Sequence, residues 1–116
     1  MTRERGKRVL TQVDIEEMIV DDLDLLEQAT EAYADLLEKE ARAESVYKRK
    51  FNRVYFQMDK GGHEARKVYA ESQCEDERDE YKMAAALTAG QKEVLWTIRG
   101  RIDAVRSLNA NVRSQV

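Results

Sequence analysis

The feature that most constrains the fold is the lack of residues that interrupt a helix. The 116-residue chain contains no proline, and the stretch 15–58 also contains no glycine. In a helix interior, proline costs about 3 kcal/mol and glycine about 1 kcal/mol relative to alanine. The stretch therefore predicts one helix of 44 residues, which would be about 66 Å long at about 1.5 Å per residue.

Apolar side chains in the stretch 15–58 recur three or four residues apart, as an amphipathic helix requires. Thr11 or Asp14 is a candidate N-cap, and acidic residues that suit the positive end of the helix dipole follow. A kink near Asp21 and Asp22, which would split off a short first helix, stays open at this stage.

The rest of the chain contains a turn and a second predicted helix. The segment 59–63 predicts a turn, because its glycine pair suits the positive φ that ends helices. The polar segment 64–82 is compatible with an exposed helix or with a partly ordered crossover. A C-terminal helix is predicted over about 84–113, with Thr88 as a candidate cap. Residues 1–10 suggest a flexible basic arm that precedes a single helical domain, residues 11–116.

The predicted C-terminal helix carries an apolar seam with alternating steps of three and four residues, as in a coiled coil. Asn109 is a polar residue within this seam, of the kind that fixes register or oligomer state. Trp96, next to the seam, is expected to pack against it. The seam residues are Leu95, Ile98, Ile102, Val105 and Asn109.

These elements predict an all-α fold, a long antiparallel helical hairpin with a polar crossover. Even a compact domain of this size buries only about two-thirds of its extended-chain surface, and a pair of helices buries less. We therefore expect a homo-oligomer, either a coiled coil or a helical bundle, with the seam as its oligomerisation contact.

Charge is segregated along the chain although the net charge is only −3. Residues 11–46 contain twelve acidic and two basic side chains, whereas residues 47–67 contain two acidic and seven basic ones. Residues 68–87 are again acidic and residues 88–116 basic. Such blocks indicate either charge pairing between helices or subunits, or a local basic surface that binds a polyanion.

Basic and aromatic residues alternate in the stretch 47–56. Proteins hold single-stranded nucleic acid with cations along its backbone and with rings that stack on its bases. Tyr55 and Phe56 are the candidate rings for stacking on bases. A row of arginines at two-turn spacing on the last helix would suit a phosphate backbone. Alternatively, the rings belong to the core and the cations pair with the acidic blocks. The predicted nucleic-acid-binding residues are Lys48, Arg49, Lys50, Arg53, Tyr55, Arg99 and Arg106.

Catalysis has little support in the sequence. The single histidine, His63, and the single cysteine, Cys74, are too few for an ordinary zinc site. The chain contains no phosphate-binding loop, nucleophile elbow or dinucleotide fingerprint. We therefore expect no enzyme, catalytic residue, metal or cofactor. No apolar stretch approaches the roughly 20 residues that span a membrane, and a single cysteine fits a reducing compartment.

Several short strings occur in the order found in one known family. They are Tyr33-Ala34-Asp35-Leu36-Leu37-Glu38-Lys39, the basic-aromatic run 48–56, Glu80-Tyr81-Lys82-Met83, Leu95-Trp96 and Ile102-Asp103-Ala104-Val105-Arg106-Ser107. Over about residues 22–110 this layout resembles the UvsY-type recombination mediators of tailed phages.

The resemblance implies a small, ring-like helical oligomer that binds single-stranded DNA in the cytoplasm of a bacterial host. Such mediators help to load a RecA-type recombinase onto DNA covered by single-strand-binding protein. Basic residues near the end of the first long helix contribute to DNA binding in that family. The matching positions here are Lys48, Arg49, Lys50 and Arg53.

A different class of function also fits the charge blocks. The chain would then be a helical structural, scaffold or adaptor protein, such as a host-protein inhibitor, that acts only through protein–protein contacts. The two hypotheses differ in where the basic side chains lie. DNA binding requires them to point outward together, whereas the second hypothesis places them against the acidic stretch 14–44.

Overall fold

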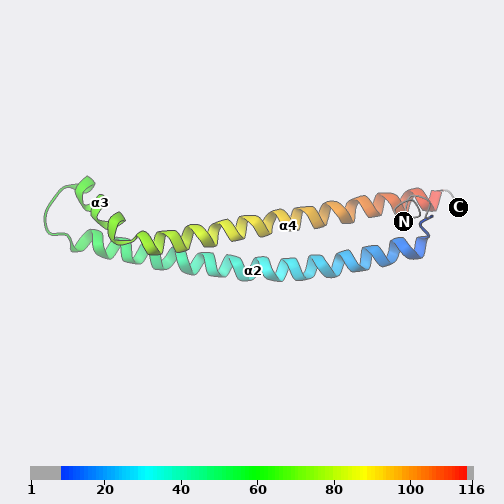
Figure 1. Ribbon diagram of the computed structural model, residues 1–116, viewed down its shortest axis with the longest axis horizontal. Helices are drawn as coiled ribbons and strands as arrows, with labels where there is room; N and C mark the ends of the chain where they lie inside the picture. The colour runs from blue at the N-terminus through cyan, green and yellow to red at the C-terminus, as the bar shows by residue number, and fades with distance from the viewer. Residues whose placement is uncertain (1–8, 115–116) are drawn as a thin grey trace, which may run out of the picture. The chain divides into compact units, whose positions relative to one another are not determined.

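The computed structural model describes residues 9–114, which form three helices and no strand (Figure 1). These helices are α2 (Gln12–Gln57), α3 (His63–Gln73) and α4 (Glu75–Ser114). The all-α prediction is confirmed, with α2 and α4 as a long helix pair and a short connector between them. Residues 1–8 of the predicted basic arm, and residues 115–116, lie outside the described residues.

A reciprocal capping box begins α2. The backbone N–H of Asp14 donates to Thr11 Oγ1 at 3.2 Å, and the backbone N–H of Thr11 donates to Asp14 Oδ2 at 3.1 Å. Two backbone donors at the helix start are satisfied in this way. Thr11 is therefore the N-cap, and α2 continues without a break through Asp21 and Asp22.

The turn between α2 and α3 depends on one glycine. Gly61 has a φ of +104°, a conformation that side chains rarely adopt. A Cβ on Gly61 would also lie 3.0 Å from the Cβ of Ala65. Gly62 is the N-cap of α3 with an ordinary negative φ. The predicted glycine turn is confirmed.

The polar segment 64–82 is helical, apart from the junction at Cys74. The backbone N–H of Cys74 donates to the Glu71 carbonyl at 3.3 Å and closes α3. α4 then begins at Glu75, earlier than the predicted start near residue 84. Acidic side chains fill its first turn, where they stabilise the positive end of the helix dipole. Of the two alternatives that the sparse apolar positions left open for this segment, the exposed helix is the one that the structure shows.

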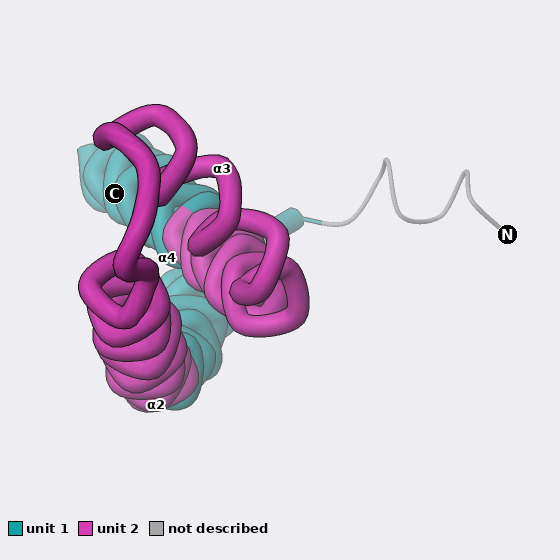
Figure 2. The backbone as a smooth tube through the Cα atoms, turned by 90° about the vertical axis from the view of Figure 1, so that its left-hand side faces the viewer, with its two compact units in different colours: residues 1–30, 93–116 teal, residues 31–92 magenta. Residues whose placement is uncertain are grey.

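The chain divides into two compact units, and both long helices contribute to each (Figure 2). Unit 1 comprises residues 1–30 and 93–116, of which residues 9–30 and 93–114 are described. On α2, the buried residues of unit 1 recur every seven positions. Its core is formed by Ile15, Asp22 and Ala29 from α2 and by Leu95, Ile102 and Val105 from α4.

Unit 2 comprises residues 31–92, in which parts of α2 and α4 accompany the whole of α3. Ala70, Cys74 and Thr88 are buried in it. The Thr88 hydroxyl oxygen lies 3.0 Å from the Ala84 carbonyl oxygen and 3.2 Å from the Leu36 carbonyl oxygen on α2. Thr88 is therefore an interior residue of α4 and not a cap, which corrects the sequence-based suggestion.

Candidate nucleic-acid interface

A row of aromatic rings lies on the side of α2 that faces the rest of unit 2. Tyr47 stacks on Tyr81 of α4 with ring centroids 6.2 Å apart. Phe51 follows, with centroids 6.1 Å from Tyr47 and 6.4 Å from Tyr55. Residues four apart share one face of a helix, so the sequence spacing itself aligns these three rings. They pack within the chain, as the core interpretation of the basic-aromatic stretch requires.

Tyr55, one of the predicted binding residues, connects the end of α2 to the beginning of α3. Its hydroxyl oxygen lies 2.8 Å from His63 Nδ1. The Arg66 guanidinium carbon lies 5.9 Å from the Tyr55 ring centroid, within cation–π range. Phe56 meets the same ring edge-on at 5.0 Å. These neighbours give Tyr55 a packing role and leave little of its ring for a base.

The two predicted lysines are paired with carboxylates. Lys48 Nζ lies 2.7 Å from Glu44 Oε1 on the same helix. Lys50 Nζ lies 2.8 Å from Glu77 Oε1 on α4, in a partly buried position. The hydrogen bond in each pair raises the pKa of the lysine and lowers the pKa of its glutamate. Each ammonium group therefore already has a carboxylate partner, with which a phosphate would compete.

The two predicted arginines of α2, unlike the lysines, have no carboxylate partner in an ion pair among the described residues. Arg49 and Arg53 are exposed, and neither forms an ion pair among residues 9–114. Phe56, seven residues after Arg49 and thus on the same face, has 74% of its surface exposed. We call Arg49, Arg53 and Phe56 the arginine face of α2. It presents the Arg49 guanidinium and one ring to solvent. Arg53 is also exposed, and it lies near enough to Glu77 of α4 to add to the effect of Lys50 in lowering the pKa of that carboxyl.

The other predicted arginines belong to unit 1. Arg99 and Arg106 are exposed on α4 and line a shallow hollow of about 190 Å³ together with Leu23, Leu26, Ile102 and Asp103. Trp96, three residues before Arg99, has 60% of its surface exposed. The expectation that Trp96 packs is therefore wrong within this chain. The seven predicted binding residues are thus divided between two units, with a ring and an arginine exposed in each.

The predicted seam is largely buried within unit 1. Leu95, Ile102 and Val105 are core residues, and Ile98 and Asn109 are half-buried. Packing within one chain accounts for the apolar spacing that the sequence showed. A contact between subunits through these residues remains a prediction.

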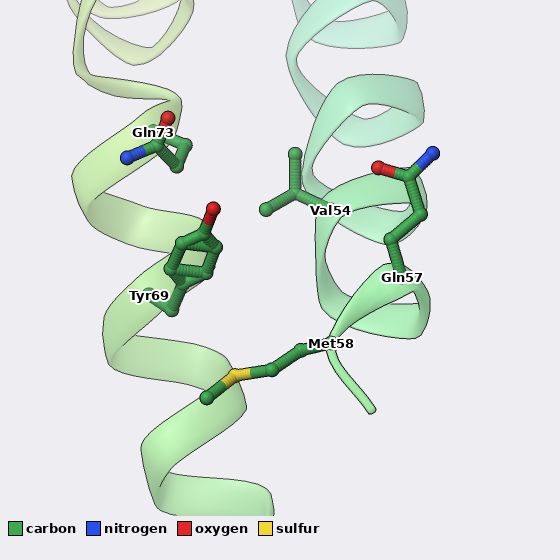
Figure 3. Close-up of a pocket in the computed structure, with 5 residues that line it drawn as sticks. All are labelled: Val54, Gln57, Met58, Tyr69 and Gln73. Carbon is green, nitrogen blue, oxygen red and sulfur yellow. The ribbon is translucent and has the colours of Figure 1, made fainter. Parts of the chain in front are cut away.

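An open hollow of about 430 Å³ lies between the end of α2 and α3 (Figure 3). The side chains of Val54 on α2 and of Met58, just after the end of α2, reach toward α3, where Tyr69 lies opposite. Gln57 and Gln73 add two amides. These five lining residues include no carboxylate, imidazole or thiol, so the Tyr69 phenol is the one group among them that could exchange a proton.

Groups suited to metal or thiol chemistry are not clustered. Over residues 9–114 there is no group of three or more His, Cys, Asp or Glu side chains that could hold a metal ion. Burial raises the pKa of the Cys74 thiol, which disfavours the reactive thiolate. Among the described residues, no helix is long and apolar enough to span a membrane.

Comparison with models of known protein families found no match. Comparisons with curated proteins and with solved structures also found none.

Proposed function

We propose that the protein is a non-enzymatic accessory protein that binds single-stranded DNA through the arginine face of α2. The observation that carries this proposal is the exposed ring of Phe56 on the same helix face as the unpaired guanidinium group of Arg49. Guanidinium groups bind phosphate oxygens in a fixed fork geometry. An exposed ring stacks on a base of any identity, since every base has a π-face.

Unit 1 offers the same chemistry a second time. Trp96 is exposed on α4, and Arg99 is exposed one turn later. Tryptophan provides a larger stacking surface than phenylalanine. A ligand with many phosphates and many bases could contact both pairs of an arginine and a ring, whereas a single small anion could occupy only one of them. This repetition favours a nucleic-acid strand as the ligand.

The resemblance to UvsY-type mediators extends the proposal to a biological role. The protein would help to load a RecA-type recombinase onto DNA covered by single-strand-binding protein, in the cytoplasm of a bacterial host. The layout of the short sequence strings supports this role.

A second candidate function is that of a scaffold or adaptor acting through protein–protein contacts alone. Its support is the pairing of Lys48 with Glu44 and of Lys50 with Glu77, which uses basic side chains within the chain. Under this function the arginine face would not bind DNA.

Fluorescence anisotropy with labelled single-stranded and double-stranded oligonucleotides, at low and moderate salt, separates the two functions. We expect tighter binding of single strands, and weaker binding as salt increases. Phe56→Ala should cost about 1–3 kcal/mol of binding free energy, the usual value of a base–aromatic stack. Arg49→Glu should also reduce the slope of log affinity against log salt by about 0.7 or more, the contribution of one single-strand phosphate contact.

The matched control is Lys82→Glu, which makes the same charge change at an exposed position on α4. It should retain nearly the wild-type affinity. Circular dichroism should show equal helix content in all variants. Wild-type affinity in both Arg49→Glu and Phe56→Ala would refute the arginine face as the binding site. No binding to any strand at low salt would favour the scaffold function.

A further inference from the structure

Unit 2 exposes large apolar side chains on both of its long helices. Val46 on α2 has 54% of its surface exposed, and Met83 and Leu87 on α4 have 65% and 55% exposed. Met83 and Leu87 form, with Asp79, Glu80 and Ala84, a hollow of about 320 Å³. Contiguous exposed apolar side chains with a polar rim are typical of an interaction surface.

Helix geometry places these residues on one flank of the α2–α4 pair. Tyr47 and Lys50 mark the side of α2 that meets α4, through Tyr81 and Glu77. At about 100° per residue, Val46 lies about 40–100° from these two markers of α2, and Met83 lies about 120–160° from the facing markers of α4. Each rotation, from the facing side to Val46 or to Met83, runs in the same direction when its helix is viewed from the N-terminus. Because the two helices run in opposite directions, these rotations bring Val46 and Met83 to the same flank of the pair.

Charged residues on this flank are divided between the helices. α2 contributes Arg53, and α4 contributes Asp76 as well as the carboxylates of Asp79 and Glu80 beside the hollow. Arg53 and Asp76 are exposed, and neither forms an ion pair among the described residues. We call Val46, Arg53, Asp76, Met83 and Leu87 the divided flank. It is basic where α2 lies and acidic where α4 lies, and its apolar side chains lie about two turns or more along the helices from Arg53 and Asp76.

The contacts within unit 2 also fix which residues lie at the same level along the helices. Lys50 is level with Glu77. Arg53, three residues further along α2, is therefore level with the beginning of α4, where Asp76 lies. Val46, four residues before Lys50, is level with the neighbourhood of Tyr81 and Met83.

We propose that the divided flank joins two copies of this chain about a two-fold axis parallel to the helices. Rotation about such an axis leaves every residue at its own level. Arg53 of one copy then faces Asp76 of the second copy, Val46 faces Met83, and each contact occurs twice. α2 and α4 of the two copies alternate in direction, as in an antiparallel four-helix bundle.

Self-complementarity is the argument for a second copy over another partner. An isologous interface requires that one patch carry both halves of each contact. The divided flank does so for charge, with Arg53 and Asp76, and for apolar contact, with Val46 and Met83. Arg53 belongs both to the arginine face and to the divided flank, so a dimer would cover it. Arg49 and Phe56 lie on the outward side of α2 and would stay accessible to DNA in the dimer, so this proposal does not rest on the proposed function.

Sedimentation velocity and light scattering on the full chain, over a range of concentrations, test the proposal with charge reversals. The wild-type chain should associate as dimers. Arg53→Glu places like charges together twice, and so does Asp76→Arg. Each variant should raise the dimer dissociation constant at least about tenfold, because like charges in an interface are costly.

Mixing the two single variants provides the decisive measurement. In a heterodimer of Arg53→Glu with Asp76→Arg, both contacts again join opposite charges, so association should return in the mixture. The double variant should associate by itself for the same reason. Lys82→Glu, a charge reversal on α4 away from this flank, should dimerise like the wild type. Circular dichroism identifies any variant that has lost its helices.

A wild-type chain that stays monomeric at every concentration would overturn the proposal. Association that both single variants retain, or that the mixture and the double variant fail to restore, would also overturn it. Failure of DNA binding in the separate Arg49 and Phe56 experiment would leave this result unaffected.

Discussion

Lys50 of α2 donates hydrogen bonds to both carboxylate oxygens of Glu77 of α4, at 2.8 and 2.9 Å. The two residues are far apart in the sequence and bring opposite charge blocks together. Arg49, the preceding residue, points elsewhere and is exposed without an ion pair among the described residues. One basic block of the sequence thus contains a cation that is paired between the two helices and a cation that is left exposed.

The Lys50–Glu77 pair predicts a pH-dependent contribution to stability. Pairing lowers the pKa of Glu77 below its ordinary value of 4.5 and raises the pKa of Lys50 above its ordinary value of 10.5. The contribution of Glu77 is present above about pH 4.5 and disappears as the pH falls through its lowered pKa. The contribution of Lys50 is present below about pH 10.5 and disappears as the pH rises through its raised pKa.

Glu77→Gln should therefore lower the melting temperature at pH 7, and the difference from wild type should shrink as the pH falls well below 4.5. Thermal unfolding followed by circular dichroism measures this. Glu80→Gln, at an exposed position of the same helix, is the control and should show little difference at either pH. A difference in melting temperature between wild type and Glu77→Gln that stays constant with pH would contradict the stabilising role of the Lys50–Glu77 pair.

The buried carboxylate of Asp22 predicts that the cost of removing Arg101 depends on whether Asp22 is present. Asp22 has 1% of its surface exposed, and its Oδ1 accepts a hydrogen bond from Arg101 at 2.7 Å. Its Oδ2 is buried without a hydrogen-bond partner among the described residues. Arg101→Met should cost about 1–3 kcal/mol in urea unfolding, because a buried acceptor loses its donor.

In an Asp22→Leu background the same Arg101→Met change should cost less than about 0.5 kcal/mol, since no buried carboxylate remains. Equal effects of Arg101→Met in the two backgrounds would show that Arg101 stabilises the fold independently of Asp22.

The glycine pair predicts a large difference between two adjacent substitutions. Gly61→Ala forces a side chain into positive φ and toward Ala65, so it should cost about 1–3 kcal/mol. Gly62→Ala has open space and an ordinary φ and should change the free energy of unfolding by less than about 0.5 kcal/mol. Equal losses from the two variants, measured by urea unfolding, would argue against this turn geometry.

Trp96 provides an optical test of exposure, because it is the single tryptophan of the chain. With 60% of its surface exposed, its fluorescence should be quenched by acrylamide almost as efficiently in the folded as in the denatured protein. Trp96→Ala should change stability by less than about 0.5 kcal/mol, as is usual for a surface position. Strong protection from acrylamide in the free protein would mean that Trp96 is covered.

Local sequence features predicted much of the architecture. The long run without proline or glycine predicted α2 nearly to its ends, Thr11 was one of two candidate caps, and the glycine pair predicted the turn. Each of these depends on residues close together in the chain. The sequence left residues 64–82 open between an exposed helix and a partly ordered crossover, because this polar segment lacks the apolar spacing that identifies a helix, and α4 begins at Glu75.

Tertiary structure decided the environment of each candidate side chain. Lys50 and Arg49 are neighbours of like charge in the sequence, yet adjacent residues lie about 100° apart around a helix, so only one of them reaches Glu77. Leu95 and Trp96 differ in the same way, with Leu95 in the core and Trp96 in solvent. The sequence by itself determined the helices and the turn, since backbone propensity is local. Which cation is paired and which ring is exposed depends on the register between α2 and α4, and contacts between residues far apart in the chain set that register.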